Sequence, residues 1–244
     1  METKTIKRLI EPNAKVITLV QFTFPLALYF ALCASMSIYY WLVSASMVVL
    51  YVMVGNNIAM HRYYSHNEFK VTAWAEVVFA WLSLTLCLGS PTSYALLHTT
   101  HHRYPLSGPD WTWKDLPFYK HIWFDNNTIQ PKISKYIIQL NKRYSWMHRY
   151  YMGLIALYVI VLTCISPIIA LFIWWLPVTV SLWIIALCVY CQHRQTAQNS
   201  KWHKFMPLYE GLHKNHHDYP GSSNNARTAA QIDYTYLLSK VFRK

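Results

Sequence analysis

Two long stretches without a charged side chain constrain this sequence more than any other feature. No Lys, Arg, Asp or Glu occurs between Val16 and Met60 or between Tyr150 and His193. Each stretch can form two helices of about 20 residues, the length that crosses a bilayer. A surface helix of a soluble domain has a polar face, and neither stretch offers one. The sequence therefore predicts an all-α integral membrane protein.

We expect a single domain over residues 1–244, in which each uncharged stretch folds into a hairpin. The first stretch divides near Ala34–Ser37. The second is expected to divide at Trp174–Pro177, with Pro167 as a kink, because a division at Ser166-Pro167 leaves a helix of about 16 residues, slightly short to span. The four expected transmembrane helices are residues 16–34, 38–58, 152–173 and 177–193.

The positive charges predict the orientation in the membrane. All 22 Lys and Arg lie outside the two stretches, so the positive-inside rule places both termini and the middle segments in the cytoplasm. The membrane would be the bacterial inner membrane or the endoplasmic reticulum. Topology and anionic lipid head groups explain the net charge of +12, and docking of an acidic electron donor is the alternative. No nucleic-acid motif is present, so no nucleic-acid partner is expected.

A fifth apolar run, Val77–Leu97, separates histidines that are expected on the same side of the membrane. A single crossing here would place His66 and His98 on opposite sides. We therefore expect an interfacial or packed helix that does not cross. The predicted architecture is two hairpins below a cytoplasmic helical cap that holds a di-metal site.

Eight of the 12 histidines fall into three clusters with the spacing of metal ligands. One is an H-x4-H motif and two are H-x2-H-H motifs. Because positions i, i+3 and i+4 share a helix face, we expect each H-x2-H-H to aim three imidazoles at one point. In H-x4-H the rings lie about 140° apart on an ideal helix, so the pair spans a helix end or reaches separate metals. The clustered residues are His61, His66, His98, His101, His102, His213, His216 and His217.

Neutral imidazole is a good ligand for iron, zinc and copper, and eight or nine rings are enough for two metals. His193 closes the second apolar stretch on the same face and is the candidate ninth ligand, with a structural role at the helix end as the alternative. His121, His148 and His203 are interpreted as structural residues.

These motifs resemble those of the membrane fatty-acid desaturases, especially the acyl-CoA desaturase type. That family has the same three motifs in this order, and the segments Glu210–His217 and Gln231–Tyr234 also match. The resemblance covers roughly residues 61 to 240. It implies a four-helix membrane stalk, a cytoplasmic cap and two non-haem irons held by the eight clustered histidines and His193.

The resemblance also implies an activity. Such an enzyme uses O2 and two electrons to form a cis double bond in an acyl chain, presented as acyl-CoA or an acyl lipid. The electrons would come from a separate donor, such as cytochrome b5 or a ferredoxin with its reductase, and membrane lipids would surround the stalk. Two positions depart from the family: Val189 replaces an Asn that holds a metal-bound water, and Leu97 replaces an acidic residue.

Two other functions remain open at this point. A related di-iron hydroxylase or ketolase of a lipid, sterol or carotenoid would insert oxygen instead of removing hydrogen. A metal-binding or metal-transporting membrane protein would carry out no catalysis. The position of the clusters just outside the apolar stretches disfavours transport, because transporters hold their ligands near the middle of the membrane.

Overall fold

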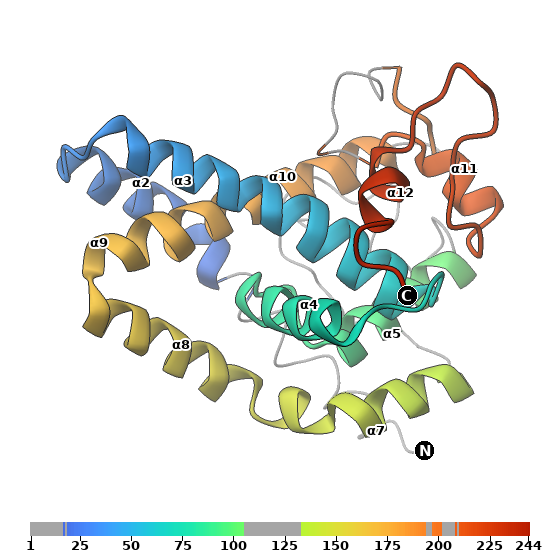
Figure 1. The fold of residues 1–244 in the computed structure, drawn as a ribbon, viewed down its shortest axis with the longest axis horizontal. Coiled ribbons are helices and arrows are strands. Elements are labelled where there is room, and N and C mark those ends of the chain that lie inside the picture. The colour runs from blue at the N-terminus through green and yellow to red at the C-terminus, as the bar shows by residue number, and fades with distance from the viewer. Residues whose placement is uncertain (1–16, 18, 105–132, 194–196, 202–207, 209) are drawn as a thin grey trace.

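The computed structural model describes residues 17, 19–104, 133–193, 197–201, 208 and 210–244. All regular elements in these ranges are helical, and the one β-bridge among them joins Val71 to Arg243. The long helices lie side by side, and the last two helices of the chain lie at one end of them (Figure 1). This agrees with the predicted all-α class.

The first apolar stretch forms a hairpin. Helix α2 (Phe24–Cys33) is followed by a turn and then by α3 (Ile38–Val49). Without a break, α3 continues as η1 (Leu50–Ser65), a wide π-helix with i→i+5 hydrogen bonds. The combined helix of 28 residues is long and apolar enough to cross a membrane. It runs from the turn between α2 and α3 to the end of the molecule where the last two helices of the chain lie (Figure 1).

The second stretch divides at a different place from the predicted one. Helix α8 (Tyr151–Ile165) ends at Ser166, which is extended and caps the next helix by accepting a hydrogen bond from Ile169. The chain then stays helical through α9 (Pro167–Ile169), η2 (Ala170–Trp175) and α10 (Leu176–Gln192). A serine N-cap followed by proline is a strong helix start, and Pro167 provides it here instead of Pro177.

Within the described ranges, two helices therefore meet the length and composition of a membrane span: Ile38–Ser65 and Pro167–Gln192. A third forms only if α7 (Lys135–Arg149) and α8, bent by 51° relative to each other, act together. The expected first span is represented by α2, which has 10 residues. The apolar helices identify a membrane protein, and the number of four spans stays a prediction.

The run Val77–Leu97 is two helices, so the prediction of one continuous helix was wrong. Helix α4 (Ala73–Thr85) and helix α5 (Pro91–Arg103) each have 13 residues, too few to cross a bilayer. Between them Cys87 and Gly89 have positive φ angles of 62° and 104°, and Ser90 caps α5. This turn lets both helices pack against η1.

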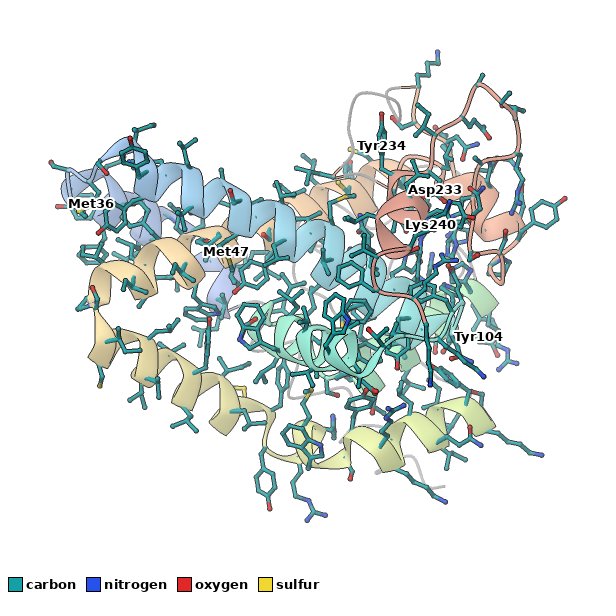
Figure 2. All side chains as sticks on the ribbon, viewed as in Figure 1. Met36, Met47, Tyr104, Asp233, Tyr234 and Lys240 are labelled. Carbon is teal, nitrogen blue, oxygen red and sulfur yellow. The ribbon has the colours of Figure 1, made fainter. Side chains whose placement is uncertain are left out.

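The remaining described helices, α11 (His213–Asp218) and α12 (Tyr234–Ser239), lie at the same end of the molecule as α5 (Figure 1). In Figure 2 Met36 marks the opposite end, whereas Tyr104 and Asp233 mark the end where the histidines gather. A continuous apolar core joins η1, α4 and α5. Its fully buried members include Tyr51, Ile58, Phe79, Leu82, Leu86 and Leu96.

Candidate metal centre

All nine histidines singled out from the sequence come together in two adjacent groups. Within each group the nearest ring nitrogens lie within 4.8 Å of one another. The five-histidine group consists of His61, His66, His98, His102 and His216. The four-histidine group consists of His101, His193, His213 and His217.

The four-histidine group is a closed ring of Nε2 atoms. Successive Nε2–Nε2 distances are 3.1, 3.0, 2.9 and 3.0 Å in the order His101, His217, His213, His193 and back to His101. Lone pairs this close repel one another unless a proton or a cation lies between them. The centre of a square with such sides is about 2.1 Å from each corner, close to a metal–imidazole bond, whereas a tetrahedron with such edges gives about 1.8 Å. The arrangement fits one metal ion with four nitrogens around it.

The five-histidine group has the same short contacts. Nε2 of His216 lies 2.9 Å from that of His61 and 3.0 Å from that of His102, and His66 approaches His98 to 2.8 Å. The donor set is again entirely imidazole, so this group fits a second metal ion.

The winding of η1 explains the first motif. Its i→i+5 hydrogen bonds include one from the amide of His66 to the carbonyl of His61, at 3.2 Å. Residues five apart then lie about one turn apart, so both rings point into the same group. Of the two predicted alternatives, the helix end is confirmed, because His66 is the C-cap, and separate metals are wrong.

Each H-x2-H-H motif divides its histidines between the two groups, so the prediction of three rings aimed at one point was wrong. In α5, His98 and His102 join the five-histidine group and His101 joins the other. In α11, His213 and His217 join the four-histidine group and His216 joins the other. Relative to position i, position i+4 is rotated about 40° one way and i+3 about 60° the other way, so the two point to different places.

Two of the rings are held through Nδ1, the ring nitrogen that does not face the other histidines, by an oxygen acceptor. Nδ1 of His193 lies 2.7 Å from the carbonyl oxygen of Val189, and Nδ1 of His61 contacts the Glu210 carboxylate. An acceptor at Nδ1 keeps the proton there and leaves Nε2 free for a metal. Nδ1 of His213 and of His216 are buried without a partner among the described residues.

Arg62 connects Glu210 to the C-terminal segment. Its Nε donates to Glu210 at 2.8 Å, and its Nη2 donates to both oxygens of Asp233 at 3.0 and 3.1 Å. Burial would raise the pKa of Glu210, but the His61 ring and the Arg62 guanidinium lower it to about 2. Sequence patterns assigned no role to Arg62, although a charge beside His61 at the end of an apolar helix was a usable signal.

Several of the clustered rings are kept neutral. Burial, reinforced by the neighbouring imidazoles, lowers the pKa values of His98, His213 and His216 well below the ordinary value. Neutral imidazole is the form that binds a metal. His148 contacts Ser90 at 2.8 Å and belongs to neither group, as expected of a structural residue. His121 and His203 lie outside the described residues.

A cavity of about 880 Å³, its mouth included, reaches both groups. Its wall is largely apolar and comes from η1, α5 and α10, with Val52, Leu88 and Ile185 among the lining residues. Leu97 and Val189 also line it. The lining is that of a site for a mostly apolar molecule that meets the histidines at one point.

Comparison with known proteins identifies a family of similar sequences. The family model described as fatty acid desaturase matches residues 38–231. The Delta-9 desaturase-like 2 protein of Arabidopsis thaliana is 23% identical over 209 residues, 75% of this chain and 67% of that protein. Delta-9 acyl-lipid desaturase 2 of Arabidopsis thaliana is 24% identical over 78% of this chain and 67% of its own length. The sn-1 stearoyl-lipid 9-desaturase of Synechocystis sp. is 24% identical, with shares of 82% and 69%.

Proposed function

The chain belongs to the fatty acid desaturase family and is an oxidoreductase, and we propose that it is a di-iron enzyme that forms a cis double bond in an acyl chain. The observation that carries this proposal is the convergence of nine imidazoles in two groups on one apolar cavity. The reaction would consume O2, two electrons and two protons, remove two hydrogens from adjacent carbons and release two molecules of water.

Iron fits the donor set better than structural zinc does. Zinc in structural sites is tetrahedral and commonly has thiolate ligands, whereas both groups here contain nitrogen alone and one of them is a ring of four. Imidazole also suits iron. When bound, the two irons would supply the oxidation by O2 of two C–H bonds. All nine clustered histidines would be their ligands.

The residues of this chain would hold the substrate and the ligands in place. The apolar wall, including Val52 and Ile185, would fix the acyl chain and exclude water from the reacting carbons. Glu210 would keep the Nδ1 proton on His61, so that Nε2 stays directed at the metal. The carbonyl of Val189 would do the same for His193.

The relatives favour an acyl lipid as the substrate. Two of them carry names that describe acyl-lipid and stearoyl-lipid desaturases, and we propose the same substrate class here, with acyl-CoA as the alternative. Cytochrome b5, or a ferredoxin with its reductase, would supply the electrons. We further propose four membrane spans in one domain, with both termini and the metal centre in the cytoplasm.

Expression in a host that lacks unsaturated fatty acids, followed by lipid analysis, tests the function. We expect new double bonds with the unmodified chain and none with His101→Ala, although both proteins insert into the membrane. An iron-loaded, membrane-inserted protein that forms no double bond in any acyl substrate would refute the proposal. A product with an inserted oxygen atom would identify a hydroxylase or ketolase instead.

A further inference from the structure

Four residues of the cavity wall each lie four positions before a clustered histidine, and therefore about one helical turn away from it. They are Asn57, Tyr94, Leu97 and Val189. The first two precede histidines of the five-histidine group and are polar. The other two precede histidines of the four-histidine group and are apolar. The wall residue one turn before the histidine is thus polar beside one group and apolar beside the other.

The polar part of the wall is a hydrogen-bonded chain of three residues. The Tyr94 hydroxyl donates to Oδ1 of Asn56 at 3.1 Å, and Nδ2 of Asn56 donates to Oδ1 of Asn57 at 2.8 Å. Asn57 is itself fixed, because its amide donates to the carbonyl of Leu208 at 3.3 Å. The Tyr94 ring stacks on His98 with 6.0 Å between centroids. These contacts connect the chain directly to the five-histidine group.

The three side chains retain unused hydrogen-bonding capacity. An amide nitrogen has two N–H groups, and Asn56 uses one of them within the described part of the chain. Oδ1 of Asn57 and the hydroxyl of Tyr94 can each accept one more hydrogen bond. One donor and two acceptors on a cavity wall are complementary to an oxygen atom that both accepts and donates.

A hydrocarbon chain would not satisfy these groups. Covering a polar group with methylenes leaves it without water or another partner, which is unfavourable for each group. We propose that Asn56, Asn57 and Tyr94 form a hydrogen-bonding site for one oxygen atom beside the five-histidine group. The oxygen belongs either to a small ligand such as water or to the lipid substrate. The inference rests on the proposed function, since it treats this cavity as the place where substrate and metals meet.

Azide tests the site for the small ligand, because it binds iron, accepts hydrogen bonds and changes the visible absorption. The titration uses the full-length, iron-loaded protein in detergent, and iron content is measured for each variant. We expect Asn56→Leu to weaken azide binding five- to tenfold, which corresponds to about one net hydrogen bond. Tyr94→Phe, which keeps the ring on His98, should weaken it about threefold. The control Tyr150→Phe, at an exposed residue outside the cavity lining, should stay within twofold.

A second titration compares 1-hexadecanol with hexadecane, which differ by one hydroxyl group. If the lipid supplies the oxygen, Asn56→Leu weakens hexadecanol binding five- to tenfold and leaves hexadecane binding unchanged. Unchanged affinities for both azide and hexadecanol in iron-loaded Asn56→Leu would overturn the proposal. If that variant loses its iron, the same comparison with Tyr94→Phe decides.

The two proposals can fail separately. Azide or alcohol binding that depends on Asn56, in a protein that forms no double bond, would refute the desaturase and leave this site standing. A working desaturase in which neither titration responds to Asn56→Leu or Tyr94→Phe would refute this site alone.

Discussion

Replacing Arg62 by methionine removes a positive charge that two buried carboxylates share. The Arg62 side chain is 1% exposed, and those of Glu210 and Asp233 are 10% and 4% exposed. Removing one partner of a buried ion pair costs about 3–5 kcal/mol, because the remaining charge is left uncompensated. For a chain of this size, that predicts a fall in melting temperature of roughly 6–20 °C.

The same substitution at Arg143 is the matched control. Arg143 pairs with Glu76, but its side chain is 59% exposed, and exposed pairs contribute about 0–1 kcal/mol. Melting is followed by intrinsic fluorescence in detergent, with iron content measured in parallel. We expect Arg62→Met to melt well below Arg143→Met. It should also bind iron 10- to 100-fold more weakly, because Glu210 then no longer holds His61 firmly.

Equal melting temperatures for the two variants would refute the reasoning about burial. Normal iron binding in a destabilised Arg62→Met protein would show instead that Arg62 stabilises the fold without orienting the histidine.

Three further predictions follow from the site and the fold. His216→Ala should abolish activity and reduce iron content while the protein still inserts in the membrane, whereas the control His148→Ala should keep its iron. Full activity of His216→Ala would remove His216 from the ligand set. The buried rings, such as His98, have lowered pKa values, so below about pH 6.5 the unfolded chain binds protons that the folded chain does not. The free energy of unfolding should therefore fall as the pH falls, with iron lost below about pH 6, and iron occupancy unchanged at pH 5 would contradict this. Gly89→Ala places a side chain at a φ of 104° and should lower the free energy of unfolding by more than about 1 kcal/mol, measured by thermal melting. The control is Gly221→Ala, because an added Cβ there meets nothing within 4 Å.

Local patterns along the chain were enough to predict the class of protein and the kind of site. The absence of charge over the two stretches indicates apolar helices, because burial in a bilayer depends on side-chain type more than on partners. The spacing of the histidines predicted metal binding for a similar reason, since helix geometry places such residues near one another. The eight residues selected in this way, together with His193 at the end of the second stretch, are the nine histidines that come together among the described residues.

Helix breaks were harder to predict, because competing local signals were close in strength. Both Pro167 and Pro177 can open a helix, and the serine cap at Ser166 decided between them. The Gly89-Ser90-Pro91 turn interrupts a run that hydropathy alone presents as continuous. In each case hydrogen bonds at the turn outweighed average hydrophobicity.

Tertiary structure decided which histidines meet in each of the two groups and what holds them there. Helix geometry turns positions i+3 and i+4 of each H-x2-H-H motif in different directions, but only the packing of the helices decides which rings from α5 and α11 come together. The π winding of η1, which turns His61 and His66 toward one group, is another such feature. Arg62 reaches Glu210 and Asp233 across 148 and 171 residues of sequence, and only packing brings such distant charges together. The sequence identified the histidines that come together, and the packing of the helices determined which group each of them joins.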